Sequence, residues 1–83
     1  MSEVRILGVL VEEKSKAAIT VQEILTKYGC SIKTRLGLND LEKENCHSCG
    51  LIMLELMGDV NECIRLENDL WALPGVRVQK MVF

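Results

Sequence analysis

The sequence is poor in the residues that mark nucleic-acid-binding chains and active sites. Among its 83 residues are one histidine, one tryptophan, one tyrosine and one phenylalanine, and its net charge is −2. Nucleic-acid-binding domains usually carry a basic stripe or a pI above about 9, whereas the pI here is near 5.3. This composition excludes direct binding to DNA or RNA and leaves a compact aliphatic core as the main expectation.

Long apolar runs are also missing. A membrane span needs about 20 consecutive apolar residues, and no run here approaches that length. Residues 1–11 lack the basic start and the length of a signal peptide. We therefore expect a soluble cytoplasmic protein without a membrane partner, whose four cysteines are reduced thiols or metal ligands rather than disulfides.

The chain is long enough for one domain, residues 1–83, with no linker or change in composition. Its hydrophobic pattern predicts four strands and two helices. Segments 4–11 and 50–57 are apolar on both faces, as in central strands covered on both sides. The helices show apolar residues at helical spacing, and Asp59 precedes the second one as an N-cap. The predicted strands cover 4–11, 31–38, 50–57 and 76–83, and the predicted helices cover 15–28 and 59–73.

This order, βαββαβ, predicts an α+β fold of the ferredoxin-like type. Right-handed crossovers convert it into a four-stranded antiparallel sheet with both helices on one face. The first and third strands then lie at the centre, which agrees with their apolar character. The helices leave the second face of the sheet open.

Strand parity predicts which apolar residues occupy that open face. We expect Ile6 and Leu10 to face the helices together with Ile52, Leu54 and Leu56, and Leu7, Val9, Met53 and Met57 to lie on the open face. A contiguous apolar patch rarely faces water in a monomer, so this face predicts a homo-oligomer. Arg5, Lys33 and Arg35 lie beside the patch and could hold an anion at a subunit boundary, or form a solvated rim.

The segment "NCHSCG", residues 45–50, carries the clearest chemical signal. Cys46 and Cys49, with His47, could bind zinc or iron, since a tight turn brings both sulfurs to one side. A structural zinc needs four ligands, so a second subunit would have to supply another pair. A redox pair and inert loop cysteines are the alternatives, and the pair precedes a strand rather than the helix N-terminus that acidifies reactive thiols. Cys30, next to the predicted strand 31–38, and Cys63, within the predicted helix 59–73, are expected to be buried as small hydrophobes.

Nothing else in the sequence forms a catalytic constellation, so we expect a non-enzymatic protein. A regulatory or sensor module, a small-molecule sensor at the subunit interface and a pure protein-interaction module are the open interpretations. A protein partner is compatible with each of them.

Several stretches carry a family resemblance, namely "RLGL", "CGLIMLEL" and "LPGVRVQKMVF". Over roughly residues 4–83 the chain resembles a small bacterial family of iron-only hydrogenase system regulators. The members look like single ACT-like domains, similar in fold to the C-terminal domain of the nickel-responsive repressor. The resemblance implies an ACT-like fold, a homo-oligomer built through its sheets and a regulatory role.

The chain departs from these relatives in features tied to their ligands. ACT domains that bind amino acids often have glycine in the first strand–helix turn, which reads "EEKSK" here. The nickel site of the repressor uses several histidines, and here only His47 is present. Neither amino-acid sensing nor nickel specificity therefore carries over.

Overall fold

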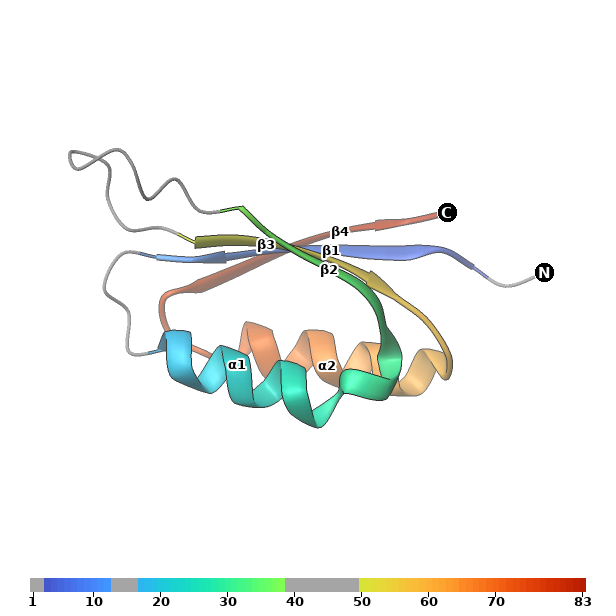
Figure 1. Cartoon of the computed structure of the whole chain (residues 1–83), viewed down its shortest axis with the longest axis horizontal. Helices are drawn as coiled ribbons and strands as arrows, with labels where there is room; N and C mark the ends of the chain where they lie inside the picture. The colour runs from blue at the N-terminus through green and yellow to red at the C-terminus, as the bar shows by residue number, and fades with distance from the viewer. Residues whose placement is uncertain (1–2, 13–16, 39–49) are drawn as a thin grey trace.

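The computed structural model describes residues 3–12, 17–38 and 50–83. Four strands and two α-helices alternate in the predicted order (Figure 1). In chain order they are β1 (Arg5–Val11), α1 (Ala17–Lys27), the 3₁₀ turn η1 (Gly29–Ser31), β2 (Ile32–Leu38), β3 (Gly50–Leu56), α2 (Val60–Trp71) and β4 (Val76–Val82). Each lies within a residue or two of its predicted bounds, and residues 15 and 16 of the first predicted helix fall outside the described ranges.

The strands form one antiparallel sheet in the order β2-β3-β1-β4. β1 and β3 are the central strands, and α1 and α2 both cover the same face of the sheet (Figure 1). The predicted ferredoxin-like βαββαβ sandwich is therefore confirmed, including the central position of the two strands that are apolar on both faces.

The start of α2 shows how local sequence sets its position. The Asp59 carboxylate accepts a hydrogen bond from the backbone N–H of Asn61 at 2.8 Å, which satisfies one of the orphan donors of the first turn. Gly58 precedes it with φ of +81°, a conformation that side chains with a Cβ rarely adopt. The Gly58–Asp59 pair thus turns the chain sharply from the end of β3 into α2.

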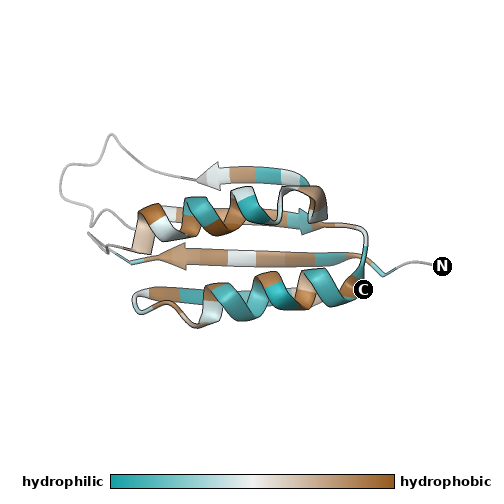
Figure 2. Cartoon of the chain, turned by 90° about the horizontal axis from the view of Figure 1, so that it is seen from below, coloured by the Kyte–Doolittle hydropathy of each residue, from teal (hydrophilic) through white to brown (hydrophobic). Residues whose placement is uncertain are grey.

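The faces of β1 are the reverse of those predicted. Leu7 and Val9 are fully buried under the helices, whereas Ile6 and Leu10 lie on the open face and are half-buried. Register explains this, because Leu7 lies opposite Leu54, which faces the helices as predicted. β1 is hydrophobic along most of its length (Figure 2), so its own sequence does not distinguish its two faces.

A second difference lies in β2. Strict alternation from residue 31 predicts Lys33 and Arg35 on the open face, but the pairing of β2 with β3 shifts between Ile32 and Thr34. Such a bulge adds one residue to a strand and reverses the side-chain alternation beyond it. As a result Thr34 lies opposite Glu55 on the open face and Arg35 lies opposite Leu54 on the helix side.

The core lies between the sheet and the two helices. It combines aliphatic side chains of β1, β3, β4 and both helices, of which the largest fully buried are Leu7, Leu25, Leu54, Leu66, Leu70, Val9 and Val21. No buried side-chain nitrogen or oxygen atom within the described ranges lacks a hydrogen-bond partner. Neither α1 nor α2 is long and apolar enough to cross a membrane.

The open face, corrected for register, still carries an apolar centre. The paired rows across the sheet bring together aliphatic and methionine side chains of all four strands, namely Leu36, Leu51, Met53, Ile6, Leu10 and Met81. Gly8 lies in the middle row, where an added Cβ would stand 3.6 Å from the sulfur of Met53, at ordinary van der Waals distance. The apolar patch predicted for this face is present and includes Met53, whereas the predicted members Leu7 and Val9 lie in the core.

Candidate functional site

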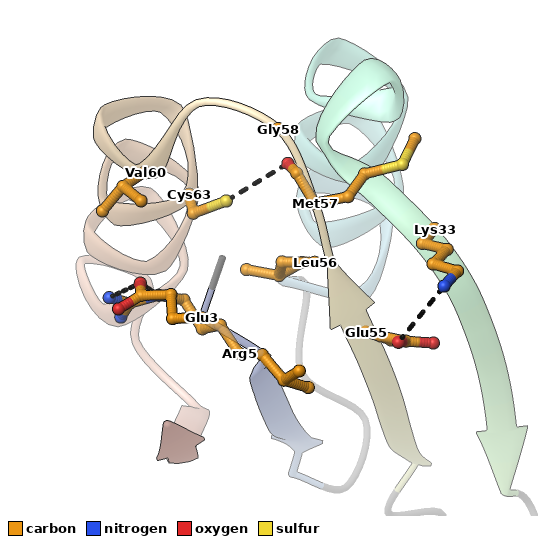
Figure 3. Close-up of a pocket in the computed structure, with 10 residues that line it drawn as sticks. Glu3, Arg5, Lys33, Glu55, Leu56, Met57, Gly58, Val60 and Cys63 are labelled. Carbon is orange, nitrogen blue, oxygen red and sulfur yellow. Dashed lines mark hydrogen bonds and ion pairs between the residues drawn. The ribbon is translucent and has the colours of Figure 1, made fainter. Parts of the chain in front are cut away.

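A cavity of about 480 Å³ opens at one end of the sheet. The start of β1, the end of β3, the start of β2 and the first turn of α2 enclose it (Figure 3). Its lining consists of Glu3, Val4, Arg5, Lys33, Glu55, Leu56, Met57, Gly58, Val60 and Cys63. The volume suits a small organic molecule, since ligand pockets typically measure about 300–1,000 Å³.

Two acid–base pairs give the cavity a polar rim. The Arg5 guanidinium donates to the Glu3 carboxylate at 2.8 Å from Nη2 and at 3.2 Å from Nε. Across the cavity, the Lys33 ammonium lies 3.8 Å from the Glu55 carboxylate. These four lining charges balance, and the remaining lining side chains are apolar or the Cys63 thiol. The pocket can therefore present both a cation and an anion to a small polar ligand above an apolar floor.

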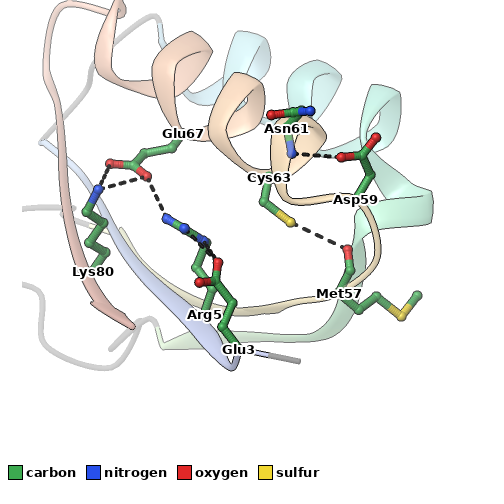
Figure 4. Close-up of polar contacts among 8 residues, drawn as sticks. All are labelled: Glu3, Arg5, Met57, Asp59, Asn61, Cys63, Glu67 and Lys80. Carbon is green, nitrogen blue, oxygen red and sulfur yellow. Dashed lines mark hydrogen bonds and ion pairs between the residues drawn. The ribbon is translucent and has the colours of Figure 1, made fainter. Parts of the chain in front are cut away.

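Arg5 belongs to a longer chain of ion pairs that runs under α2 (Figure 4). Its guanidinium lies 3.6 Å from Glu67, whose carboxylate lies 3.2 Å from Lys80 on β4. The side chains of Arg5 and Glu67 are each only 10% exposed. Breaking a buried ion pair is costly because it leaves a charge without compensation, so Arg5 first of all fixes α2 to the central strand.

Cys63 forms part of the wall between the cavity and the core. Its thiol is buried and donates a hydrogen bond to the backbone oxygen of Met57 at 3.4 Å (Figures 3 and 4). Burial raises the pKa of this thiol above its ordinary value, and the nearby Arg5 cation opposes that shift only in part. Since the thiolate is the nucleophile, Cys63 acts here as a structural side chain rather than a reactive one.

The structure brings together two of the three cations that the sequence singled out for anion binding. Arg5 and Lys33 line the same cavity. Arg35 does not, because beyond the bulge its guanidinium donates to the Gln22 side chain on α1. Sequence reasoning missed Glu3 and Cys63, although Glu3 stands two residues before Arg5 and so shares its side of an extended chain.

The cysteines of the chain separate into three groups. Cys63 is buried as predicted, but Cys30 is exposed, because it lies in the turn η1 rather than within β2. Cys46, His47 and Cys49 fall outside the described residues. In the ranges 3–12, 17–38 and 50–83, no three histidine, cysteine or acidic side chains are grouped as metal ligands.

Solved structures similar to this chain share its whole fold. An uncharacterized protein from Thermotoga maritima is 28% identical, covers 99% of both chains and superposes with a TM-score of 0.83. The ACT domain of GTP pyrophosphokinase from Chlorobium tepidum is 13% identical over 96% of this chain and 100% of its own, with a TM-score of 0.69. A nitrogen regulatory PII-like protein from Thiomonas intermedia, solved with ADP, AMP and bicarbonate, is 13% identical over 99% of this chain and 93% of its own, with a TM-score of 0.61.

These likenesses define the class of fold. The chain has an ACT-like, ferredoxin-like βαββαβ fold, with the strand order and helix placement described above. Within that class, its strongest similarity among these structures is to the Thermotoga maritima protein, over nearly the full length of both chains. No protein-family model matches the sequence, and no curated protein is significantly similar to it.

Proposed function

We propose that this chain is a non-enzymatic regulatory or sensor module whose effector binds in the cavity at the end of the sheet. The observation that carries the proposal is the cavity itself, which places Arg5, Lys33 and two carboxylates around an apolar floor. The ACT-like fold, shared with a domain of GTP pyrophosphokinase and a nitrogen regulatory protein, supports a regulatory role. Its proposed setting is the cytoplasm, as part of an iron-only hydrogenase system, which follows from the sequence resemblance.

The effector class is a small anion or a metabolite that carries an anionic group. Lys33 is the cation best able to receive it, because its side chain is 63% exposed and lies at 3.8 Å from Glu55, beyond hydrogen-bonding distance. A ligand anion can therefore displace a weak internal contact. Arg5, whose donors already reach Glu3, positions the wall of the pocket. Arg35 was the third predicted member of this set and contacts Gln22 instead.

A thermal-shift screen with ADP, AMP, bicarbonate, inorganic phosphate and small carboxylates tests this function. A ligand at about 100 times its Kd stabilises the fold by about 2.7 kcal/mol, which raises the melting temperature. We expect Lys33→Ala to abolish the rise. Lys27→Ala is the matched control: it removes a similarly exposed cation of α1, which pairs with Asp69 of α2, and it should leave the rise intact. Equal effects of the two variants would contradict the proposed pocket.

The second candidate function is binding of zinc or iron through Cys46 and Cys49, with His47. The spacing of the two cysteines supports it, and a shared site would take one pair from each of two subunits. We expect metal analysis of protein purified without a His tag to give about half an equivalent per chain, because two chains supply the four ligands. Cys46→Ser should remove the metal, whereas Cys30→Ser should retain it. Less than about one-tenth of an equivalent in the unmodified protein would contradict a metal site.

The proposed working form is a homo-oligomer that covers the open sheet face. The apolar centre around Met53, Ile6 and Leu10 supports this contact, since such patches are rarely left to water. Light scattering at micromolar concentration should give a multiple of the chain mass. Met53→Lys should lower that mass, while the substitution Glu23→Lys at an exposed position of α1 should not. A monomer mass for the unmodified chain would contradict the oligomer.

A further inference from the structure

Arg5 presents one edge of its guanidinium to the cavity. Its side chain is only 10% exposed, and its Nε and Nη2 atoms both donate to the same oxygen of Glu3, at 3.2 and 2.8 Å (Figure 4). An arginine edge of this kind binds a free carboxylate best through two parallel hydrogen bonds, one to each carboxylate oxygen. A single oxygen of Glu3 accepts both bonds, so the internal pairing uses this edge less well than a free carboxylate can.

Glu67 holds the same guanidinium from another side. Its carboxylate lies 3.6 Å from Nη1 of Arg5 and 3.2 Å from the Lys80 ammonium, and its side chain is only 10% exposed. Neither of these contacts involves the Nε–Nη2 edge. Arg5 therefore keeps its place beside the cavity whether or not Glu3 is bound to it, and a position that is fixed in advance costs a ligand less to bind.

Glu3 is fastened less firmly than its partner. It precedes β1, and its side chain is 35% exposed. Among the residues that the structure describes, Arg5 is the one hydrogen-bond and ion-pair partner of the Glu3 side chain. Val4, the next residue, already exchanges backbone hydrogen bonds with Phe83. A rotation of the Glu3 side chain is therefore enough to release its carboxylate into water, without loss of backbone pairing in the sheet.

The charges around Arg5 require one anion on this edge. Arg5 and Lys80 supply two positive charges, and Glu3 and Glu67 supply two negative ones. Departure of Glu3 alone leaves an excess positive charge at a buried position, which is costly. A monoanion from solution restores the balance, whereas a dianion exceeds it. The charge of the ligand that this edge accepts is therefore the charge that Glu3 already provides.

The surroundings of the edge indicate the rest of the ligand. The cavity wall beside Arg5 contains Leu56, which lies opposite it on β3, and Val60 and Cys63 in the first turn of α2 (Figure 3). The thiol of Cys63 already donates to the backbone oxygen of Met57. The wall thus offers mainly hydrocarbon, and burial of apolar surface favours a ligand with a hydrocarbon body.

We propose that the Nε–Nη2 edge of Arg5 is a binding position for a monocarboxylate with a hydrocarbon body, and that Glu3 occupies it as a built-in competitor. Binding exchanges one carboxylate for another, since the ligand takes both donors of Arg5 and the Glu3 carboxylate moves into water. Arg5 is compensated before and after the exchange. Only a ligand that pairs with Arg5 better than Glu3 does is retained, so Glu3 sets the affinity threshold of the site.

This inference rests on the proposed function in one respect only, that the effector enters the same cavity. It does not depend on Lys33. Lys33 pairs with Glu55, which faces the open side of the sheet with its neighbour Ile6, whereas Arg5 contacts Glu67 on the helix side. The two cations therefore define two separate anion positions at the end of β3, and variants of each can be compared.

Isothermal titration with benzoate tests the exchange, with benzamide as the neutral isostere. Glu3→Gln keeps the shape of the side chain and removes its charge, which weakens the internal competitor. We expect benzoate to bind Glu3→Gln about ten-fold more tightly than the unmodified chain, because charge-assisted hydrogen bonds are roughly twice as strong as neutral ones. Benzamide should show no such gain. Glu12→Gln is the matched control: it neutralises an exposed carboxylate just beyond the other end of β1, and it should leave the Kd of benzoate within about two-fold.

The gain must also depend on Arg5. Arg5→Met alone leaves Glu67 buried without its partner, so the double variant Arg5→Met with Glu67→Met is used, in which neither charge of the buried pair remains. In this background Glu3→Gln should change the Kd of benzoate by less than about two-fold, since no guanidinium is left for Glu3 to occupy. A ten-fold gain in this background would overturn the role of Arg5.

Lys33→Ala separates this position from the one in the proposed function. If the ten-fold ratio between Glu3→Gln and its parent persists in Lys33→Ala, the carboxylate lies on Arg5. If Lys33→Ala abolishes binding of benzoate to both proteins, the position at Lys33 stands and the position at Arg5 is overturned. Equal affinities of the unmodified chain and Glu3→Gln, or no binding of benzoate by either, would also overturn the exchange.

Discussion

The ion-pair chain through Arg5 and Glu67 yields the sharpest test of how this small fold is stabilised. Replacing Glu67 with methionine keeps most of the side-chain volume and removes the carboxylate that joins Arg5 on β1 to Lys80 on β4. Arg5 then remains buried with Glu3 as its partner. Lys80 is half exposed and turns to water.

The expected loss follows from these surroundings. Removing one partner of a buried ion pair typically costs about 3–5 kcal/mol, but the remaining ion pair of Arg5 with Glu3 compensates part of this cost. Loss of the Lys80–Glu67 pair adds only about 0–1 kcal/mol, as for surface pairs. We therefore expect Glu67→Met to lower the free energy of unfolding by about 2–4 kcal/mol. For a chain of this length the total is only about 4–12 kcal/mol.

The double variant Arg5→Met with Glu67→Met should be far less destabilised than the sum of the single variants. Replacing both charges of a buried pair by apolar side chains is often close to neutral. Urea unfolding of the unmodified chain, the two single variants and the double variant, all at the same protein concentration, gives a double-mutant cycle. The expected coupling energy is about 1–3 kcal/mol. Arg65→Met, which removes an exposed pair with Glu62, should cost under about 0.5 kcal/mol. Additive losses at residues 5 and 67 would refute the reasoning.

Three further expectations concern single groups. Asp59→Ala should lower the free energy of unfolding by about 1 kcal/mol because the N-cap of α2 is lost. Asp59→Asn should keep most of the capping stabilisation, and thermal unfolding distinguishes the two variants. The hydrogen bond to Asp69 raises the pKa of Tyr28, so absorbance titration of this sole tyrosine should give a midpoint above 10.0 that falls in Asp69→Ala. Because the pKa of Tyr28 is higher in the folded than in the unfolded chain, this difference stabilises the fold at lower pH. That stabilisation should be lost as the pH rises through the folded pKa. In a background with Cys46 and Cys49 replaced by serine, a disulfide reagent at neutral pH should modify Cys30 at once and Cys63 only after unfolding. Equal rates at the two thiols would contradict the burial of Cys63.

The elements and their order could be predicted because each carries a local signal. Apolar spacing identified both helices, the cap at Asp59 and the Pro74–Gly75 pair bounded α2, and the doubly apolar strands indicated the centre of the sheet. The faces of β1 could not be predicted, since they depend on its register with β3 rather than on its own residues. Leu7 lies in the core because Leu54 is opposite it.

The site was predicted only in part for similar reasons. Arg5 and Lys33 share a cavity as expected, but a bulge in β2 directs Arg35 to α1. No residue type in this part of the sequence indicates a bulge. Glu3 and Cys63 join the cavity from segments sixty residues apart in the sequence. Such a meeting depends on the packing of α2 against β1, which local patterns do not specify. The metal site at residues 46–49 stays a prediction, outside the described residues.

The strand order also governs how this chain must fold in time. β1 lies between β3 and β4, so its two neighbours in the sheet are the last two strands to be synthesised. The pairing that closes β1 against β4 joins Val4 to Phe83, nearly the full length of the chain. Contacts of such long range slow folding because the chain must lose loop entropy before they form. We therefore expect the emerging chain to keep one side of the apolar first strand unpaired until the last strand is available, which gives a late closure of the sheet.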